Sequence, residues 1–139
     1  MTREQIIAEA VKWLETPWRH QGRTQRGLDC AGLIIRVGND LQLIQYDVKA
    51  YPRHTHRDAF IRHFKAVLKE KTVPQRLKGD VVLFRDGIYA CHCGIIDLDA
   101  DGKEFVIHAY EVRKKVVREE LTPDLKNKMT HCFEFPEVI

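Results

Sequence analysis

Cys30, His92 and His108 are residues of the types that nucleophilic catalysis uses, and the expected helix and strands could bring them together. The pair Asp29-Cys30 precedes a segment of helical periodicity, so Asp29 is expected to cap a helix and Cys30 to lie in its first turn. Backbone N–H groups and the helix dipole stabilise an anion there, and therefore a thiolate. A nucleophilic thiol also requires a base within hydrogen-bond reach. Cys30 is therefore a candidate nucleophile if a histidine lies beside it.

Two of the seven histidines, His92 and His108, lie in neighbouring segments that read as strands joined by a turn at residues 99–102. The separation of 108 − 92 = 16 residues leaves room for both strands, so one ring can contact the other across them. We expect His92 to act as base and later as acid. His108 is expected to hold the His92 ring in the correct tautomer.

Two other interpretations remain open from the residues alone. A buried cysteine is most often a small apolar side chain, and a strand histidine is most often a core or edge residue. Cys91-His92-Cys93 also resembles part of a zinc site. Zinc pairs usually have two to four residues between their ligands, however, and this sequence lacks a matching second pair. We therefore expect neither a metal nor a cofactor.

The candidate residues depend on a fold in which helices precede strands. Apolar periodicity predicts three helices: one capped by Thr2 with Gln5 and ended by Pro17, one over residues 29–41 and one over 58–71. Residues 46–55 are expected to be irregular. Five strands are predicted, at residues 81–84, 92–98, 105–110, 116–121 and 131–135. The prediction is an α+β fold with N-terminal helices packed on a C-terminal antiparallel sheet of about five strands.

Composition and charge narrow the possible partners. The 139 residues, 44% apolar and 31% charged, suit one globular domain over residues 1–139. The net charge is only +3 and acids interleave with the bases, so no nucleic-acid partner is expected. No apolar run approaches the roughly 20 residues that span a bilayer, so no membrane insertion is expected. The polar N-terminus predicts synthesis in the cytoplasm without a signal peptide, and the four cysteines are expected to be free thiols.

Five segments, in order along most of the chain, carry a resemblance to a known family. They are residues 16–22 (TPWRHQG), 28–33 (LDCAGL), 79–84 (GDVVLF), 92–96 (HCGII) and 105–110 (FVIHAY). They resemble the NlpC-type cell-wall cysteine peptidases, a papain-like family with a DCSGL-like nucleophile motif and GDLVFF-like, HVGIY-like and IHA-like strands. The first segment is similar to the TPYRHQG-like start of a subgroup associated with phage tails.

The resemblance implies that Cys30 is the nucleophile, His92 the base and His108 the third, orienting residue. It implies hydrolysis of an amide in the peptide stem of peptidoglycan, usually between a γ-linked D-glutamate and a diamino acid. Trp18 stands where the family usually has a tyrosine near the nucleophile. Trp18 and Asp29 are therefore weaker candidates for contacts with the substrate or the oxyanion.

The implied partners are peptidoglycan peptides and, in the tail-associated subgroup, other phage tail proteins. The implied location is a virion tail, or the cell wall after delivery by one. The alternative is a non-catalytic tail assembly or structural module with the same fold, because a fold does not guarantee its chemistry. The presence of Cys30, His92 and His108 together favours the enzyme.

Overall fold

The structure is a computed structural model that describes residues 1–52 and 58–139. Its helices are α1 (Arg3–Val11), α2 (Cys30–Asp40), α3 (Ala59–Val67) and α4 (Pro123–Lys128), with two 3-10 helices, η1 (Val73–Gln75) and η2 (Glu111–Arg113). Its strands are β1 (Arg23–Thr24), β2 (Gly27–Leu28), β3 (Lys69–Lys71), β4 (Val81–Asp86), β5 (Tyr89–Leu98), β6 (Glu104–Tyr110), β7 (Lys115–Glu120) and β8 (Met129–Glu134). Within these residues, no helix is long and apolar enough to cross a membrane.

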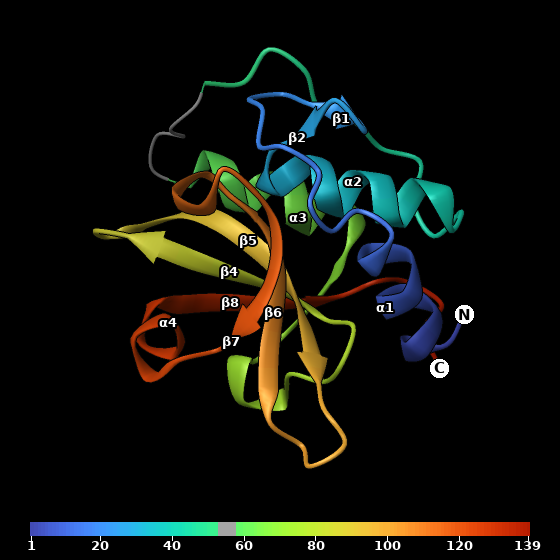
Figure 1. Ribbon diagram of the computed structural model, residues 1–139, viewed down its shortest axis with the longest axis vertical. Coiled ribbons are helices and arrows are strands. Elements are labelled where there is room, and N and C mark those ends of the chain that lie inside the picture. Colours follow the sequence, from blue (N-terminus) through green and yellow to red (C-terminus); the bar gives the residue numbers. More distant parts are fainter. Residues whose placement is uncertain (53–57) are drawn as a thin grey trace.

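Six of the strands form one antiparallel sheet in the order β3-β8-β4-β5-β6-β7 (Figure 1). The helices α1, α2 and α3 pack against one face, where Leu33, Phe64 and Ile95 belong to the larger apolar cluster. The other face carries a smaller cluster that includes Val82, with Leu125 of α4 packed against it. This arrangement confirms the predicted α+β fold of N-terminal helices on an antiparallel sheet.

The five predicted strands are present as β4 to β8, and the sixth, β3, corrects the predicted third helix. That helix was expected to reach residue 71 but ends at Val67, because Leu68 is extended at φ −115° and ψ 159°. Residues 69–71 then pair with residues 132–134 of β8. Pairing along the exposed edge of the sheet therefore overrides the helical periodicity of this segment.

The first helix also ends earlier than Pro17. Its predicted capping box is present, since Thr2 accepts from the Gln5 N–H and the Gln5 side chain accepts from the Thr2 N–H. The helix stops at Val11 because the chain that follows it is hydrogen-bonded to β7. Glu15 donates its N–H to Val116 O at 2.9 Å. Residues 46–52 are irregular as predicted, while residues 53–55 of that prediction lie outside the described residues.

The strands β5 and β6 separate at the end of the sheet nearest α2. Their ladder runs from Leu98–Glu104 to Ile95–Ile107. Beyond that point β5 continues to pair with β4 as far as Tyr89, and β6 continues to pair with β7 as far as Tyr110. Side chains of residues 92 and 108 can therefore approach each other across a gap between two strands that no longer share backbone hydrogen bonds.

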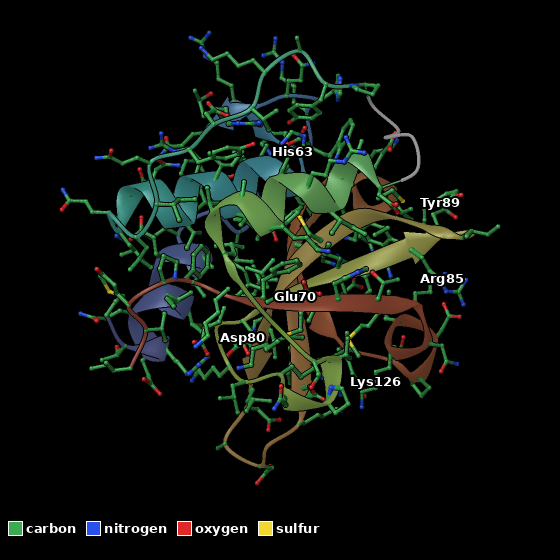
Figure 2. All side chains as sticks on the ribbon, turned by 180° about the vertical axis from the view of Figure 1, so that it is seen from behind. His63, Glu70, Asp80, Arg85, Tyr89 and Lys126 are labelled. Carbon is green, nitrogen blue, oxygen red and sulfur yellow. The ribbon has the colours of Figure 1, made fainter. Side chains whose placement is uncertain are left out.

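A buried carboxylate ties α1 and β3 to the sheet. Asp80, labelled in Figure 2, lies just before β4. Its side chain is 0% exposed and lies 2.8 Å from both Arg3 Nη1 and Lys71 Nζ. It also accepts the N–H of Leu77 at 2.7 Å. Arg3 and Lys71 both contact Glu134 of β8 as well. One fully buried acceptor thus joins the first helix, the edge strand and the loop before β4.

Removing this carboxylate is expected to destabilise the fold. It leaves the Leu77 N–H without its acceptor, and it leaves the two largely buried cations, Arg3 and Lys71, with Glu134 as their shared carboxylate. We predict that Asp80→Ala lowers the free energy of unfolding by about 3 kcal/mol. Urea denaturation followed by circular dichroism measures this. The matched control is Glu70→Gln, whose exposed pair with Lys65 spans 3.9 Å and is expected to contribute less than about 0.5 kcal/mol. Equal stability of the two variants would contradict the prediction.

Candidate active site

Cys30 is the first residue of α2, as predicted, and Asp29 is its N-cap. The Asp29 side chain accepts the Gly32 N–H at 2.8 Å, which satisfies one of the free donors of the first turn. The remaining N–H groups and the helix dipole lie next to the Cys30 sulfur. The helix continues through buried residues that anchor it to the sheet, so the thiol is held on a rigid support.

The Asp29 carboxylate also holds the two loops that border Cys30. It is 4% exposed, accepts the Gln21 N–H at 2.8 Å and lies 3.2 Å from Arg23 Nη1. The Tyr51 hydroxyl donates to the same carboxylate and accepts from Arg23 Nη2 at 2.9 Å. These contacts show a positioning function for Asp29 at the helix start. The predicted contact of Asp29 with a substrate or oxyanion stays a prediction.

His92 and His108 come together in the gap between β5 and β6. His92 Nε2 lies 2.7 Å from His108 Nδ1, and the ring centroids are 4.9 Å apart. A β-bulge at Cys91, between the pairs Phe84–His92 and Arg85–Ala90, interrupts the alternation of β5 just before His92. The predicted contact between the two rings is therefore present, and the other nitrogen of His92 is the one available to Cys30.

Gly94 makes room for this arrangement. A Cβ atom at residue 94 would lie 3.0 Å from His108 Cβ and 2.5 Å from Val106 Cγ2. Any side chain would therefore push His108 away from His92. The glycine is needed here for the close approach of a neighbouring strand.

The neighbours of Cys30 favour its thiolate. The Cys93 thiol, as a hydrogen-bond donor, and the adjacent His92 ring lower the pKa of Cys30 to about 5, although burial and the Asp29 charge act in the opposite direction. Burial raises the pKa of Cys93 well above its usual value, so Cys93 keeps its proton and can donate it to the sulfur of Cys30. The lowered pKa favours the thiolate of Cys30, the form that a nucleophile requires.

The environment of His108 keeps that ring neutral. Burial lowers the pKa of His108 to about 4, the positive charge of His92 acts in the same direction, and Glu119 only partly opposes them. His108 Nε2 lies 2.7 Å from Glu119 Oε1. Burial raises the pKa of Glu119, but His108 and Arg113 outweigh it and leave the pKa below its usual value. At neutral pH the pair of side chains therefore consists of a neutral His108 and an ionised Glu119.

A cleft of about 350 Å³ opens beside the thiol. Its lining includes Trp18, Cys30, His92, Tyr110, Arg85 and Lys128. The β4–β5 hairpin projects from the body of the molecule and carries Arg85 and Tyr89 near its end (Figure 2). Trp18 thus lies on the wall of the cleft, where a substrate would contact it, and this function of Trp18 stays a prediction.

Sequence reasoning missed Cys93 and Glu119. Side chains alternate along a strand, so residues 117 and 119 lie on one face, and this was a signal for Glu119. The register that places Glu119 beside His108, however, could not be predicted from the sequence. All four cysteines are free thiols. Residues 1–52 and 58–139 contain no group of three or more His, Cys, Asp or Glu side chains that could hold a metal ion.

Residues 15–134 match the NlpC/P60 family, and the chain therefore belongs to it. The chain is 33% identical over 87 residues to the probable endopeptidase NlpC of Escherichia coli, a match that covers 61% of this chain and 49% of that protein. The chain thus matches about half the length of this curated relative. This membership and the architecture together confirm the predicted NlpC-type fold.

Solved structures with the same fold include a domain of a peptidoglycan hydrolase and a non-catalytic protein. The NlpC/P60 domain of the peptidoglycan hydrolase SagA superposes with a TM-score of 0.68 at 20% identity, covering 96% of this chain and 99% of that one. RipD from Mycobacterium tuberculosis, a non-catalytic NlpC/P60 protein adapted to peptidoglycan binding, gives 0.61 at 15% identity and covers 95% of each chain. At these identities the likeness shows the fold, so activity must be argued from this site.

The Cys93 thiol provides a direct test of how Cys30 is activated. The related strand motif has valine at this position, so Cys93→Val is expected to fold while it removes the donor. We predict that the pKa of Cys30 rises by about one unit, the order of one hydrogen bond to a charged group. The rate of iodoacetamide alkylation of Cys30 against pH, followed by peptide mass spectrometry, measures this shift.

The matched control for that experiment is Cys91→Ala. Burial raises the pKa of Cys91, and this thiol is not a hydrogen-bond donor to Cys30. Its removal should leave the Cys30 profile in place. An unchanged midpoint in Cys93→Val would show that Cys93 only fills space.

Proposed function

We propose that the chain is a cysteine peptidase that hydrolyses an amide in the stem peptides of peptidoglycan. The observation that carries the proposal is the arrangement of Cys30 and His92 at the cleft: a thiol with a pKa lowered to about 5 beside a ring whose far nitrogen is 2.7 Å from His108. A thiolate and an imidazole held in this way form the activated pair of nucleophilic acyl transfer.

In the proposed mechanism the Cys30 thiolate attacks the carbonyl carbon and forms a C–S bond. The Cys30 N–H, which has no partner within the helix, is the proposed donor to the oxyanion. His92 gives the proton on its Nδ1 to the leaving nitrogen as the C–N bond breaks, which leaves a thioester. His92 Nδ1 then takes a proton from water, which attacks the thioester and releases the acid and the Cys30 thiolate.

The family and the charges of the cleft support peptidoglycan peptides as substrates. The probable endopeptidase NlpC and the peptidoglycan hydrolase SagA are similar to this chain. Stem peptides carry free carboxylates and amines, and the lining of the cleft offers both signs of charge: the bases Arg85 and Lys128 and the acids Asp86 and Glu111. The proposed bond is the one between D-glutamate and the diamino acid.

A phage or prophage tail is the proposed means of delivery to the wall. The support is the likeness of residues 16–22 to the start of tail-associated family members. This segment lies beside the nucleophile, where Gln21 and Asp29 are hydrogen-bonded. Other tail proteins are then the proposed partners, and detection of the chain in purified tail particles by mass spectrometry would test this part.

Digestion of purified sacculi tests the activity and the bond together. We predict that the protein releases muropeptides whose masses correspond to cleavage after D-glutamate, and that Cys30→Ala and His92→Ala lower the rate by at least about 10³-fold. The melting temperature of Cys30→Ala should change little, because the substitution removes only one sulfur atom. Liquid chromatography with mass spectrometry measures the products.

The control is Cys132→Ala, which removes a thiol that lies on the opposite face of the sheet, near Asp80. That variant should cleave at the rate of the unaltered protein when compared at equal folded concentration. Sacculus binding without any product, by the unaltered protein and Cys30→Ala alike, would contradict the proposal. It would favour the non-catalytic module, as in RipD.

A further inference from the structure

Glu119 continues the line of contacts that begins at His92. Its Oε1 lies 2.7 Å from Nε2 of His108, a ring that is 0% exposed. Its Oε2 lies 3.1 Å from Nη2 and 3.3 Å from Nε of Arg113. The proposed mechanism assigns no function to this carboxylate, although it is hydrogen-bonded to a ring that in turn contacts the proposed base, His92.

The strand register places these groups on one diagonal of the sheet. On β5 and β6, Ile95 pairs with Ile107, so His108 lies beside Gly94, two residues from His92. On β6 and β7, His108 pairs with residue 117 and Val106 pairs with Glu119. Each step from His92 to His108 to Glu119 therefore moves one strand sideways and two residues along, which is the diagonal contact that long side chains make in a sheet.

The carboxylate determines where the protons of the two rings lie. An ionised carboxylate can only accept a hydrogen bond, so the Nε2 of His108 must carry a hydrogen. A neutral imidazole has only one N–H, so the Nδ1 of His108 is left as an acceptor. The Nε2–H of His92 must then donate to it, and the Nδ1 of His92 faces Cys30.

We propose that Glu119 is a positioning residue of the active site, which fixes the tautomer of His108 and through it the orientation and proton of His92. This inference rests on the proposed function of Cys30 and His92. A protonated His92 has two N–H donors and needs two acceptors, the Cys30 thiolate and the Nδ1 of His108. Glu119 guarantees the second acceptor, because a carboxylate hydrogen-bonded to a histidine fixes the tautomer of that ring, as in serine-protease triads and behind metal-binding histidines.

The surroundings of His108 offer no other charged acceptor among the groups described against it. The ring stacks on Tyr110 with 4.7 Å between centroids, contacts His92, and has Arg113 and Glu119 beyond its Nε2. Of these, only Glu119 carries a negative charge. Its loss would leave both tautomers of His108 accessible, and one of them presents an N–H to His92.

Replacement of Glu119 by glutamine should reverse the chain of hydrogen bonds. Arg113 has only donors, so it would hold the amide oxygen and turn the amide NH₂ toward His108 Nε2. His108 would then carry its hydrogen on Nδ1 and could no longer accept from His92. Arg113→Met in the same protein would free the amide to rotate, so that its oxygen again accepts from His108.

We therefore predict that Glu119→Gln lowers kcat by at least about 10²-fold with little change in KM, because a wrong tautomer removes acid–base help of this order. It should also raise the midpoint of Cys30 alkylation by iodoacetamide. Adding Arg113→Met to Glu119→Gln should restore kcat by about tenfold or more. The matched control is Glu120→Gln, the next residue, whose exposed carboxylate pairs with Lys103 at 3.4 Å and should have no effect.

Circular dichroism and thermal melts confirm that each variant is folded, and kcat is compared at equal folded concentration. A purely structural function of Glu119 would lower the melting temperature while kcat and the alkylation profile stay unchanged, and Arg113→Met would then rescue nothing. That result overturns the inference. Failure of the protein to cleave sacculi would refute the proposed function. Alkylation needs no substrate, so the alkylation shift would still show whether Glu119 acts on Cys30 through the two histidines.

Discussion

The hydrogen-bonded line that crosses β5, β6 and β7 is the constraint on which the site depends. His92, His108 and Glu119 are joined by two contacts of 2.7 Å each. The line exists because β5 and β6 stop pairing at Ile95 and Ile107, which opens a gap for the rings. It also requires a residue without a side chain at Gly94, since a Cβ atom there would lie 3.0 Å from His108 Cβ. Strand geometry, rather than a flexible loop, therefore positions His92, the proposed base.

Cys30, the proposed nucleophile, is positioned by the start of α2. Asp29 caps α2 and binds the loops around residues 21–23 and 51, so the start of the helix is fixed relative to these loops. Burial alone would raise the pKa of Cys30, and the lowered value of about 5 shows that the hydrogen bond from Cys93 and the His92 ring outweigh it. The buried His108 must stay neutral, because a protonated ring has two N–H groups and therefore no acceptor for the N–H of His92.

Much of this arrangement was predictable from local sequence. The Asp29 cap, the start of α2 and the five strands β4 to β8 follow from patterns that span a few residues. The ends of α1 and α3 did not, because pairing of residues 15–16 with β7 and of residues 69–71 with β8 decides them. Glu119 and Cys93 were missed for a related reason. Their contacts with His108 and Cys30 depend on strand register and on the meeting of distant segments, which no short pattern records.

The protonation of His108 is the most direct test of this site. Nitrogen-15 NMR of protein labelled at histidine can distinguish a ring nitrogen that carries a hydrogen from one that does not. With His108→Gln used to assign its signals, the structure predicts one N–H on His108, at Nε2, and an unprotonated Nδ1 from about pH 5.5 to pH 8, because the pKa of His108 is lowered to about 4. A doubly protonated His108 in this range, or a hydrogen on Nδ1, would contradict the proposed line from Glu119 to Cys30.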